Sequence, residues 1–373
     1  MMDFIKPNNK MEFIPQIEPW IDENELKHLK RLVDNKYVVE NILTKEFEDM
    51  VRNHTGAKHV ISIANGTLAL YTCLVALGIG KGDEVIVPNL TFIATANAVV
   101  MAGASPIFCD VDKKSMQIDP NLIERYITNK TKAIIPVHLY GNSVDIYEIM
   151  DICKRKNIKL IEDAAQGVGV FYDERHVGTF GDCGVLSYYG NKTITCGEGG
   201  IILTNDDEIA KKCYRLKNHG RDKKGVFIHE HIGFNFSFTE MQAAIGISQM
   251  EKLERIIERK KEIHDRYVNE LDGLGDFIPQ LFNKKVRPVY WFTSFLTSKK
   301  EELSEYLLSC NIQSRDFFYP LNLQPCYNIG RNDEFSNSIS LYKTGISLPS
   351  SYVLTSEQQD YIIDCIKKFY NNK

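Results

Sequence analysis

Residues 158–200 read IKLIEDAAQGVGVFYDERHVGTFGDCGVLSYYGNKTITCGEGG, and they contain two short apolar runs that each end in polar residues. Asp163 follows the first run directly, and Lys192 follows the second run after a turn that contains Gly190. Short runs that are apolar throughout are typical of strands buried on both faces of a sheet. The sequence therefore predicts two buried strands whose carboxyl ends carry an acid and a lysine, at the edge where α/β proteins bind ligands.

Similar β-rich runs occur on both sides of this stretch and alternate with helical segments. We expect strands at 59–64, 84–87, 105–110, 132–138, 158–162, 183–188 and 200–204. One helix is expected to begin at Asp119-Pro120, and a long one at Thr239, where Gln242 completes a capping box. This alternation predicts an α/β sheet covered by helices.

The pattern changes after the long helix. A β-rich run at 290–296, a helix near 300–309 and a final helix from Ser356 indicate a second, smaller unit. A chain of 373 residues is too long for one ordinary core and suits this division. We expect an N-terminal arm and helix at 1–35, a large ligand-binding domain at 36–250 and a small C-terminal domain at 251–373.

Composition excludes several classes of protein. The 45 basic and 49 acidic residues nearly cancel, which argues against nucleic-acid binding. Nine cysteines without a CxxC pair argue against a disulfide framework and a zinc ribbon, and favour a reducing compartment. His229 and His231 lack a well-placed third ligand, so no metal is expected. The most apolar long window, 91–109, is too interrupted to cross a membrane, and we expect a cytoplasmic protein.

Two features at other strand ends suit a phosphorylated aromatic ligand. Gly66 and Thr67 follow the strand at 59–64 and open a helix, where backbone N–H groups bind phosphate. Phe92 follows the strand at 84–87 and offers a face on which a ring stacks. Taken alone, Gly66 is more often part of a plain β-to-α turn, and Phe92 is more often a core side chain.

Asp163 and Lys192 are the two remaining groups that such a ligand site would need. Asp163 is placed to hold the proton of a ring nitrogen, or merely to cap the next segment, and Gln166 could reach an oxygen of the same ring. Lys192 lies between an apolar strand and the glycines at 197–200, where burial lowers a lysine pKa and makes the amine nucleophilic. Ser187 is near enough to contact a phosphate. Together these features predict pyridoxal 5′-phosphate (PLP) bound as an imine to Lys192.

The chain resembles the DegT–DnrJ–StrS family of sugar aminotransferases over nearly its whole length. The matching stretches are Asn65-Gly-Thr, Gly82-Asp-Glu-Val-Ile-Val-Pro88, Val137-His-Leu-Tyr-Gly141, Glu162-Asp-Ala-Ala-Gln166, Ser187-x4-Lys192, Gly197-Glu-Gly-Gly200, Gly233-x-Asn235 and Ser347-Leu-Pro349. The resemblance implies an α/β type I aminotransferase fold, with a mostly parallel central sheet, helices on both of its faces and a smaller α+β C-terminal domain.

The resemblance also implies roles for single residues. Lys192 is the lysine that forms the imine, and Asp163 is the partner of the ring nitrogen. The remaining cofactor contacts that it implies are Gly66, Thr67, Phe92, Gln166, Ser187 and, from the neighbouring subunit, Asn235. The chain is therefore expected to form a homodimer with shared active sites.

Within the family, segment 190–200 is most similar to enzymes that aminate C4 of nucleotide-linked 4-keto-6-deoxyhexoses, of the GDP-perosamine or UDP/dTDP-viosamine type. Glutamate is the expected amino donor. Arg315 is the first candidate for holding the sugar diphosphate and Arg221 the second. Phe317 and Tyr319 would offer aromatic surface to the hexose or base. Asn322, which stands where many relatives have histidine, is a further expected substrate contact.

Three alternatives stay open at this point. A sugar 3-aminotransferase of the same family would use the same cofactor site. A 3-dehydratase of the family typically has histidine at the imine position, so Lys192 argues against it. A regulatory family member without catalysis would have no need to keep Lys192, Asp163, Gln166 and Ser187 together.

Overall fold

The central sheet is formed by seven strands in the order β1-β9-β8-β5-β4-β2-β3. The structure is a computed structural model that describes residues 11–222, 225 and 227–371, so the first ten residues of the expected N-terminal arm lie outside it. The strands are β1 (His59–Ile63), β2 (Glu84–Pro88), β3 (Ser105–Cys109), β4 (Thr131–Ile134), β5 (Lys159–Asp163), β8 (Cys183–Ser187) and β9 (Gly200–Thr204). Each predicted run forms one of them. β4 ends before the predicted residue 138 because Pro136 has no N–H to donate to a strand ladder.

The sheet is mostly parallel, as predicted. β3, β2, β4, β5 and β8 pair in parallel, whereas β9 is antiparallel to both β8 and β1. The link from β8 to β9 is short and contains no crossover helix, which forces the chain to reverse. Lys192 lies in this link, and the carboxyl ends of β1, β5 and β8 therefore meet at one edge of the sheet.

Helices cover both faces of the sheet because the strand residues alternate between two apolar cores. Along β2, Val85 and Val87 belong to one core and Ile86 to the other. The first core is closed by α3 (Gly66–Ala76), α4 (Ala94–Met101) and α7 (Asp207–Lys217). The second is closed by α2 (Ile42–Thr55), α6 (Ile146–Lys156) and the long helix α8 (Glu240–Glu270).

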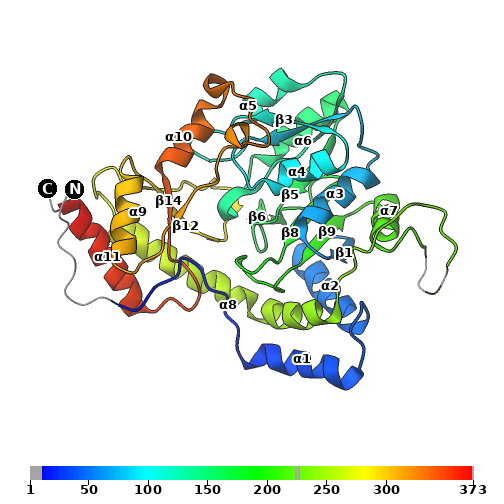
Figure 1. Ribbon diagram of the computed structural model, residues 1–373, viewed down its shortest axis with the longest axis horizontal. Coiled ribbons are helices and arrows are strands. Elements are labelled where there is room, and N and C mark those ends of the chain that lie inside the picture. The colour runs from blue at the N-terminus through cyan, green and yellow to red at the C-terminus, as the bar shows by residue number, and fades with distance from the viewer. Residues whose placement is uncertain (1–10, 223–224, 226, 372–373) are drawn as a thin grey trace.

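The second half of α8 packs in a separate core with a small antiparallel sheet. This sheet has the order β10-β12-β14-β13, with β10 (Ile278–Pro279), β12 (Thr293–Leu296), β14 (Gly345–Leu348) and β13 (Arg315–Asp316). α9 (Lys300–Ser309) and α11 (Ser356–Asn371) cover it. α8 thus reaches from the large sheet to the small one, and Figure 1 shows it along the lower side of the molecule.

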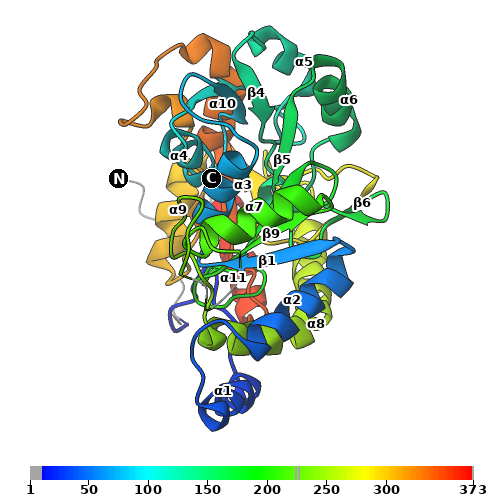
Figure 2. The same cartoon turned by 90° about the vertical axis from the view of Figure 1, so that its right-hand side faces the viewer.

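The remaining elements are short or peripheral. They are α1 (Glu23–Asn35), α5 (Pro120–Ile123), α10 (Ser336–Thr344), and the sheet formed by β6 (Phe171–Tyr172), β7 (Arg175–His176) and β11 (Val286–Arg287). Two-residue strands carry no periodicity, which is why they were not predicted. In both views α1 lies outside α8, away from the central sheet (Figures 1 and 2). Among the described residues, no helix is both long and apolar enough to cross a membrane.

The first residue of α8 fastens α2 to the rest of the fold. The predicted capping box of Thr239 and Gln242 is present. Glu240 beside it is buried, and its carboxylate accepts hydrogen bonds from the backbone N–H groups of Asn41, Leu43 and Thr44, each at 2.8 Å. Asn41 is the N-cap of α2 but makes no capping bond with its own side chain. Glu240 therefore takes over the capping of α2 and adds a negative charge at its N-terminus.

We predict that Glu240→Ala lowers the free energy of unfolding by about 2–3 kcal/mol, because three buried donors lose a charged acceptor. Urea unfolding followed by circular dichroism measures the change. The matched control is Glu258→Ala on the exposed side of the same helix, which should change stability by less than about 0.5 kcal/mol. Equal losses in the two variants would contradict the capping role.

Candidate active site

A cavity of about 590 Å³ lies at the carboxyl edge of the central sheet. Its wall is formed by the ends of β5 and β8, the start of α3, the link that carries Lys192, and residues of the small sheet. The lining residues are Asn65, Gly66, Thr67, Leu68, Leu70, Thr91, Phe92, Ala94, Thr95, Asp163, Ala165, Gln166, Ser187, Tyr189, Asn191, Lys192, Glu198, Trp291, Arg315 and Phe318. Eight residues of the predicted site are among them: Gly66, Thr67, Phe92, Asp163, Gln166, Ser187, Lys192 and Arg315.

The start of α3 forms an anion cradle at one end of the cavity. The Asn65 side chain caps the helix by accepting from the N–H of Leu68 at 3.0 Å. A Cβ on Gly66 would lie 3.3 Å from Cβ of Ser187, which is tighter than ordinary contact. Glycine at this position therefore lets the Ser187 hydroxyl and the first N–H groups of α3 converge. That arrangement suits a phosphate.

Asp163 is a buried carboxylate that opens onto the cavity. Its Oδ2 accepts from Oγ1 of Thr95 at 2.7 Å, and its Oδ1 accepts from the N–H of Ala165 at 3.1 Å. Burial raises the pKa of Asp163, while the bonds from Thr95 and Ala165 and the charge of Lys192 act in the opposite direction. A cationic group in the cavity would stabilise the ionised form further.

The neighbouring Glu162 has a structural role instead. Its side chain points to the other face of β5 and is fully buried. Its carboxylate accepts from the N–H groups of Gly178, Phe180 and Gly181 and lies 3.0 Å from Nε2 of His138. Glu162 is thus saturated within the protein, and Asp163 is the acid of this pair that faces the cavity.

Gln166 is oriented by a backbone donor. Its Oε1 accepts from the N–H of Tyr140 at 2.7 Å, so its Nε2 is left to donate to an oxygen in the cavity. Tyr140 has a φ of 55°, in the left-handed region that non-glycine residues seldom adopt. Sequence reasoning missed this support because a single left-handed residue leaves no periodic signal, although the glycine that follows Tyr140 was a hint.

Lys192 brings a nucleophile into the same cavity. Enclosure by the protein lowers the pKa of its amine from 10.5 to about 8, against the opposing effect of Asp163 and with a smaller contribution from Arg315. Its Nζ lies 4.4 Å from the centre of the Trp291 ring. A partly buried amine that is partly neutral near pH 8 is suited to attack a carbonyl carbon.

The aromatic contacts differ from the prediction by one residue. Phe317 is buried, with its ring 4.8 Å from that of Tyr140, and does not line the cavity. Phe318 lines it instead, with its ring 5.9 Å from that of Phe92. Neighbouring side chains of an extended segment point to opposite sides, so a predicted pair of phenylalanines could not be assigned to one side from sequence alone.

Four other predicted residues lie outside the cavity of this chain. The Asn322 side chain is buried and bonded to Asn89, Gly330 and Asn332, so its amide is already used within the protein. Tyr319 packs against Tyr342 at 5.0 Å, and the Arg221 side chain donates to Asn218. Asn235 is exposed on the surface.

Thr95, Asn191 and Trp291 also line the cavity but were not predicted from the sequence, although Thr95 stands one helical turn after the predicted Phe92.

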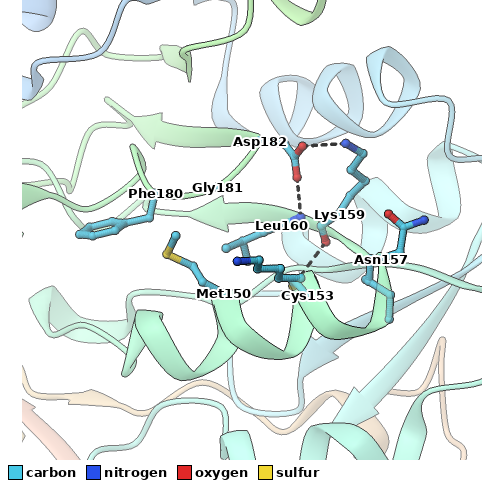
Figure 3. A pocket seen from close by; sticks show the side chains of 10 residues that line it. Met150, Cys153, Asn157, Lys159, Leu160, Phe180, Gly181 and Asp182 are labelled. Carbon is cyan, nitrogen blue, oxygen red and sulfur yellow. Dashed lines mark hydrogen bonds and ion pairs between the residues drawn. The ribbon is translucent and has the colours of Figure 1, made fainter.

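A second cavity, of about 440 Å³, lies at the opposite end of β5 (Figure 3). Its acid, Asp182, accepts from Nζ of Lys159 at 2.8 Å and from the N–H of Leu160 at 2.9 Å. Figure 3 shows both bonds as dashed lines. Because this carboxylate is already paired within the protein, the cavity at the carboxyl end of β5 is the stronger candidate for an active site.

Residues 19–367 match the DegT/DnrJ/EryC1/StrS aminotransferase family. A GDP-perosamine synthase of Escherichia coli O157:H7 is 38% identical over 368 residues, which cover 97% of this chain and 100% of that protein. A GDP-perosamine synthase of Vibrio cholerae is 38% identical over 96% of this chain and 99% of that protein. The solved structure of S. venezuelae DesV in complex with a ketimine intermediate is 28% identical, with a TM-score of 0.92 over 97% of this chain and 99% of that chain. The family and fold predicted from the motifs are confirmed.

The charges around Lys192 predict opposite effects of two substitutions. Asp163→Asn removes the negative charge that favours the ammonium form, so the pKa of Lys192 should fall below about 8. Arg315→Gln removes a positive charge, so this pKa should rise. The pH dependence of Lys192 acylation in the cofactor-free protein, followed by mass spectrometry of the Lys192 peptide, measures both. Asp182→Asn at the other end of β5 should leave the midpoint unchanged. Shifts of the same sign for Asp163 and Arg315 would contradict this account.

Proposed function

We propose that this chain, which belongs to the DegT/DnrJ/EryC1/StrS aminotransferase family, is a PLP-dependent enzyme that aminates C4 of a nucleotide-linked 4-keto-6-deoxyhexose. The observation that carries the proposal is one cavity in which an amine of lowered pKa, a buried carboxylate and an anion cradle converge. The GDP-perosamine synthases that match over almost their whole length support the sugar class. Glutamate is the proposed amino donor.

The residues of the cavity fit PLP. The cradle of Gly66, Thr67 and Ser187 would hold the phosphate, and the Gln166 amide would donate to the ring oxygen. Phe92 would cover one face of the ring, and the Asp163 carboxylate would accept a hydrogen bond from the protonated ring nitrogen. When bound, PLP supplies an aldehyde that exchanges amino groups and a ring that withdraws electrons.

Lys192 performs the proton chemistry. Its amine, neutral in part near pH 8, would hold the cofactor between turnovers and would be released by the donor amino group. The released amine then takes the proton from Cα of glutamate as a general base and returns a proton as a general acid. In the second half-reaction, it delivers a proton to C4 of the sugar.

Asp163 supplies a fixed negative charge to the site. Thr95 and Ala165 hold its two oxygens in a fixed orientation, so no reorganisation is required during the reaction. Its negative charge also favours the protonated form of a nearby base. Loss of this carboxylate should therefore impair both half-reactions, because the ring of bound PLP would withdraw electrons in each of them.

The sugar nucleotide has its own candidate contacts. Arg315 is exposed at the cavity wall, where it could pair with a diphosphate, and Tyr189 and Phe318 offer aromatic surface. The chain is slightly acidic overall, so basic groups at the cavity must pair with the negative charge of the diphosphate. Arg315 is the cavity cation besides Lys192 among the described lining residues.

We expect Arg315→Ala to lower kcat/KM for the sugar about 10- to 150-fold, as a charged hydrogen bond is lost. Single-turnover measurements should find the glutamate half-reaction little changed, because glutamate carries no diphosphate. Arg315→Lys, which keeps the charge, should recover part of the loss. A loss that falls mainly on glutamate would make Arg315 a carboxylate clamp, and turnover of 3-keto but not 4-keto sugars would refute the C4 assignment.

A homodimer with shared active sites is part of the proposal. Phe227, Ile228 and Ile232 are 81%, 76% and 85% exposed, and they stand on the same segment as the exposed Asn235. Large apolar side chains gathered in this way favour a protein interface. Asn235 is proposed to cross that interface to the phosphate of the partner site.

The nine cysteines carry free thiols, which supports a location in the reducing cytoplasm.

Hybrid dimers test the shared site. Lys192→Ala and Asn235→Ala should each be inactive, whereas their mixture after subunit exchange should recover up to about a quarter of wild-type activity. The reason is that half of the dimers are hybrids, and each hybrid holds one site with both residues intact. If Asn235 served the site of its own subunit, mixing would restore nothing, and an active monomer would remove the proposal.

A further inference from the structure

Trp291 links the small sheet to the lysine of the cavity. Its side chain is buried and lies just before β12. The indole Nε1 donates to the backbone carbonyl of Asn191 at 2.6 Å, and the ring face lies 4.4 Å from Nζ of Lys192. One side chain thus contacts both the backbone before Lys192 and the end of its side chain.

We propose that Trp291 is a positioning residue that holds the Lys192 amine where the cofactor aldehyde must meet it. The inference rests on the proposed function and goes beyond it, because no motif of the sequence pointed to Trp291. The residue acts on Lys192 and need not react itself.

The link that carries Lys192 has little other support near the amine. Between β8 and β9, the N–H of Lys192 donates to the carbonyl of Tyr189 at 2.9 Å and forms a tight turn. Within the described chain, Nζ of Lys192 has no hydrogen bond or ion pair closer than its contact with the Trp291 ring. A lysine side chain loses rotamer freedom when it is fixed in one position. Contact with an aromatic face offsets part of that cost.

Trp291 is in turn fixed by Lys260 of α8. Nζ of this buried lysine donates to the carbonyl of Trp291 at 3.1 Å and to that of Ser350 at 2.8 Å. Burial lowers the pKa of Lys260 to about 7. The Trp291 ring also stacks on Phe292 at 3.8 Å. The backbone and the ring of Trp291 are therefore both constrained, as a positioning role requires.

The experiment separates attachment of the cofactor from its recognition. Attachment joins the neutral amine of Lys192 to the aldehyde carbon and releases one water molecule. Stopped-flow absorbance after mixing cofactor-free protein with PLP measures its rate. The affinity for pyridoxamine phosphate reports recognition alone, since that molecule has no aldehyde. Trp291→Phe keeps an aromatic ring but loses the N–H donor to Asn191. Trp20→Phe is the matched control, because Trp20 stacks on Tyr352 and does not line the cavity.

Trp291→Phe should slow attachment about five- to tenfold while the affinity for pyridoxamine phosphate changes less than twofold. Lys260→Met should act in the same direction, and Trp20→Phe should change neither quantity. An unchanged attachment rate, or an equal loss in both measurements, would overturn the positioning role. Borohydride trapping and peptide mapping of the wild type guard the premise: a label on a lysine other than Lys192 would refute the proposed function instead.

Discussion

Asp163 and Lys192 are both enclosed at the wall of one cavity, and the other parts of the site are arranged around these two opposite charges. Enclosure by the protein raises the pKa of Asp163 and lowers the pKa of Lys192, and the attraction between the two charges opposes both shifts without cancelling them. The same enclosure would be unfavourable for either group alone. Thr95 and Ala165 bond the carboxylate, and the Trp291 ring contacts the amine. The surrounding protein thus supplies contacts to two opposite charges that enclosure alone would disfavour.

The sheet brings these charges together from distant parts of the chain. Asp163 ends β5, Lys192 follows β8, and the anion cradle follows β1, whose direction agrees with the other two only because β9 runs the opposite way. Supports come from outside the sheet: the left-handed backbone of Tyr140 sets the Gln166 amide, and Trp291 arrives from the small sheet. The cavity is therefore a joint product of both cores, and the chemistry depends on their relative placement.

Sequence reasoning recovered the features that repeat or that follow a strand directly. Asp163, Ser187 and Gly66 were found because each stands at the end of an apolar run, and the capping box at Thr239 was found because its spacing is fixed. Phe317 was chosen over Phe318 because nothing in the sequence tells which side of an irregular segment faces inward. Asn322 was expected at the substrate because its position in a motif does not reveal that its amide is buried and bonded. Trp291 could not be found, since its contact with Lys192 joins residues about a hundred positions apart.

The length of α8 has a further consequence for how the molecule comes apart. Its 31 residues extend over about 46 Å, and its buried side chains belong first to the core under the large sheet and then to the core of the small one. If α8 detached from either core, the other core would also lose the apolar side chains that this helix contributes to it. The two halves should consequently melt as one cooperative unit, and a fragment cut in the middle of α8 would expose apolar surface on both pieces. Because the two cores share α8, the large and small units should unfold in one transition although they look like separate domains.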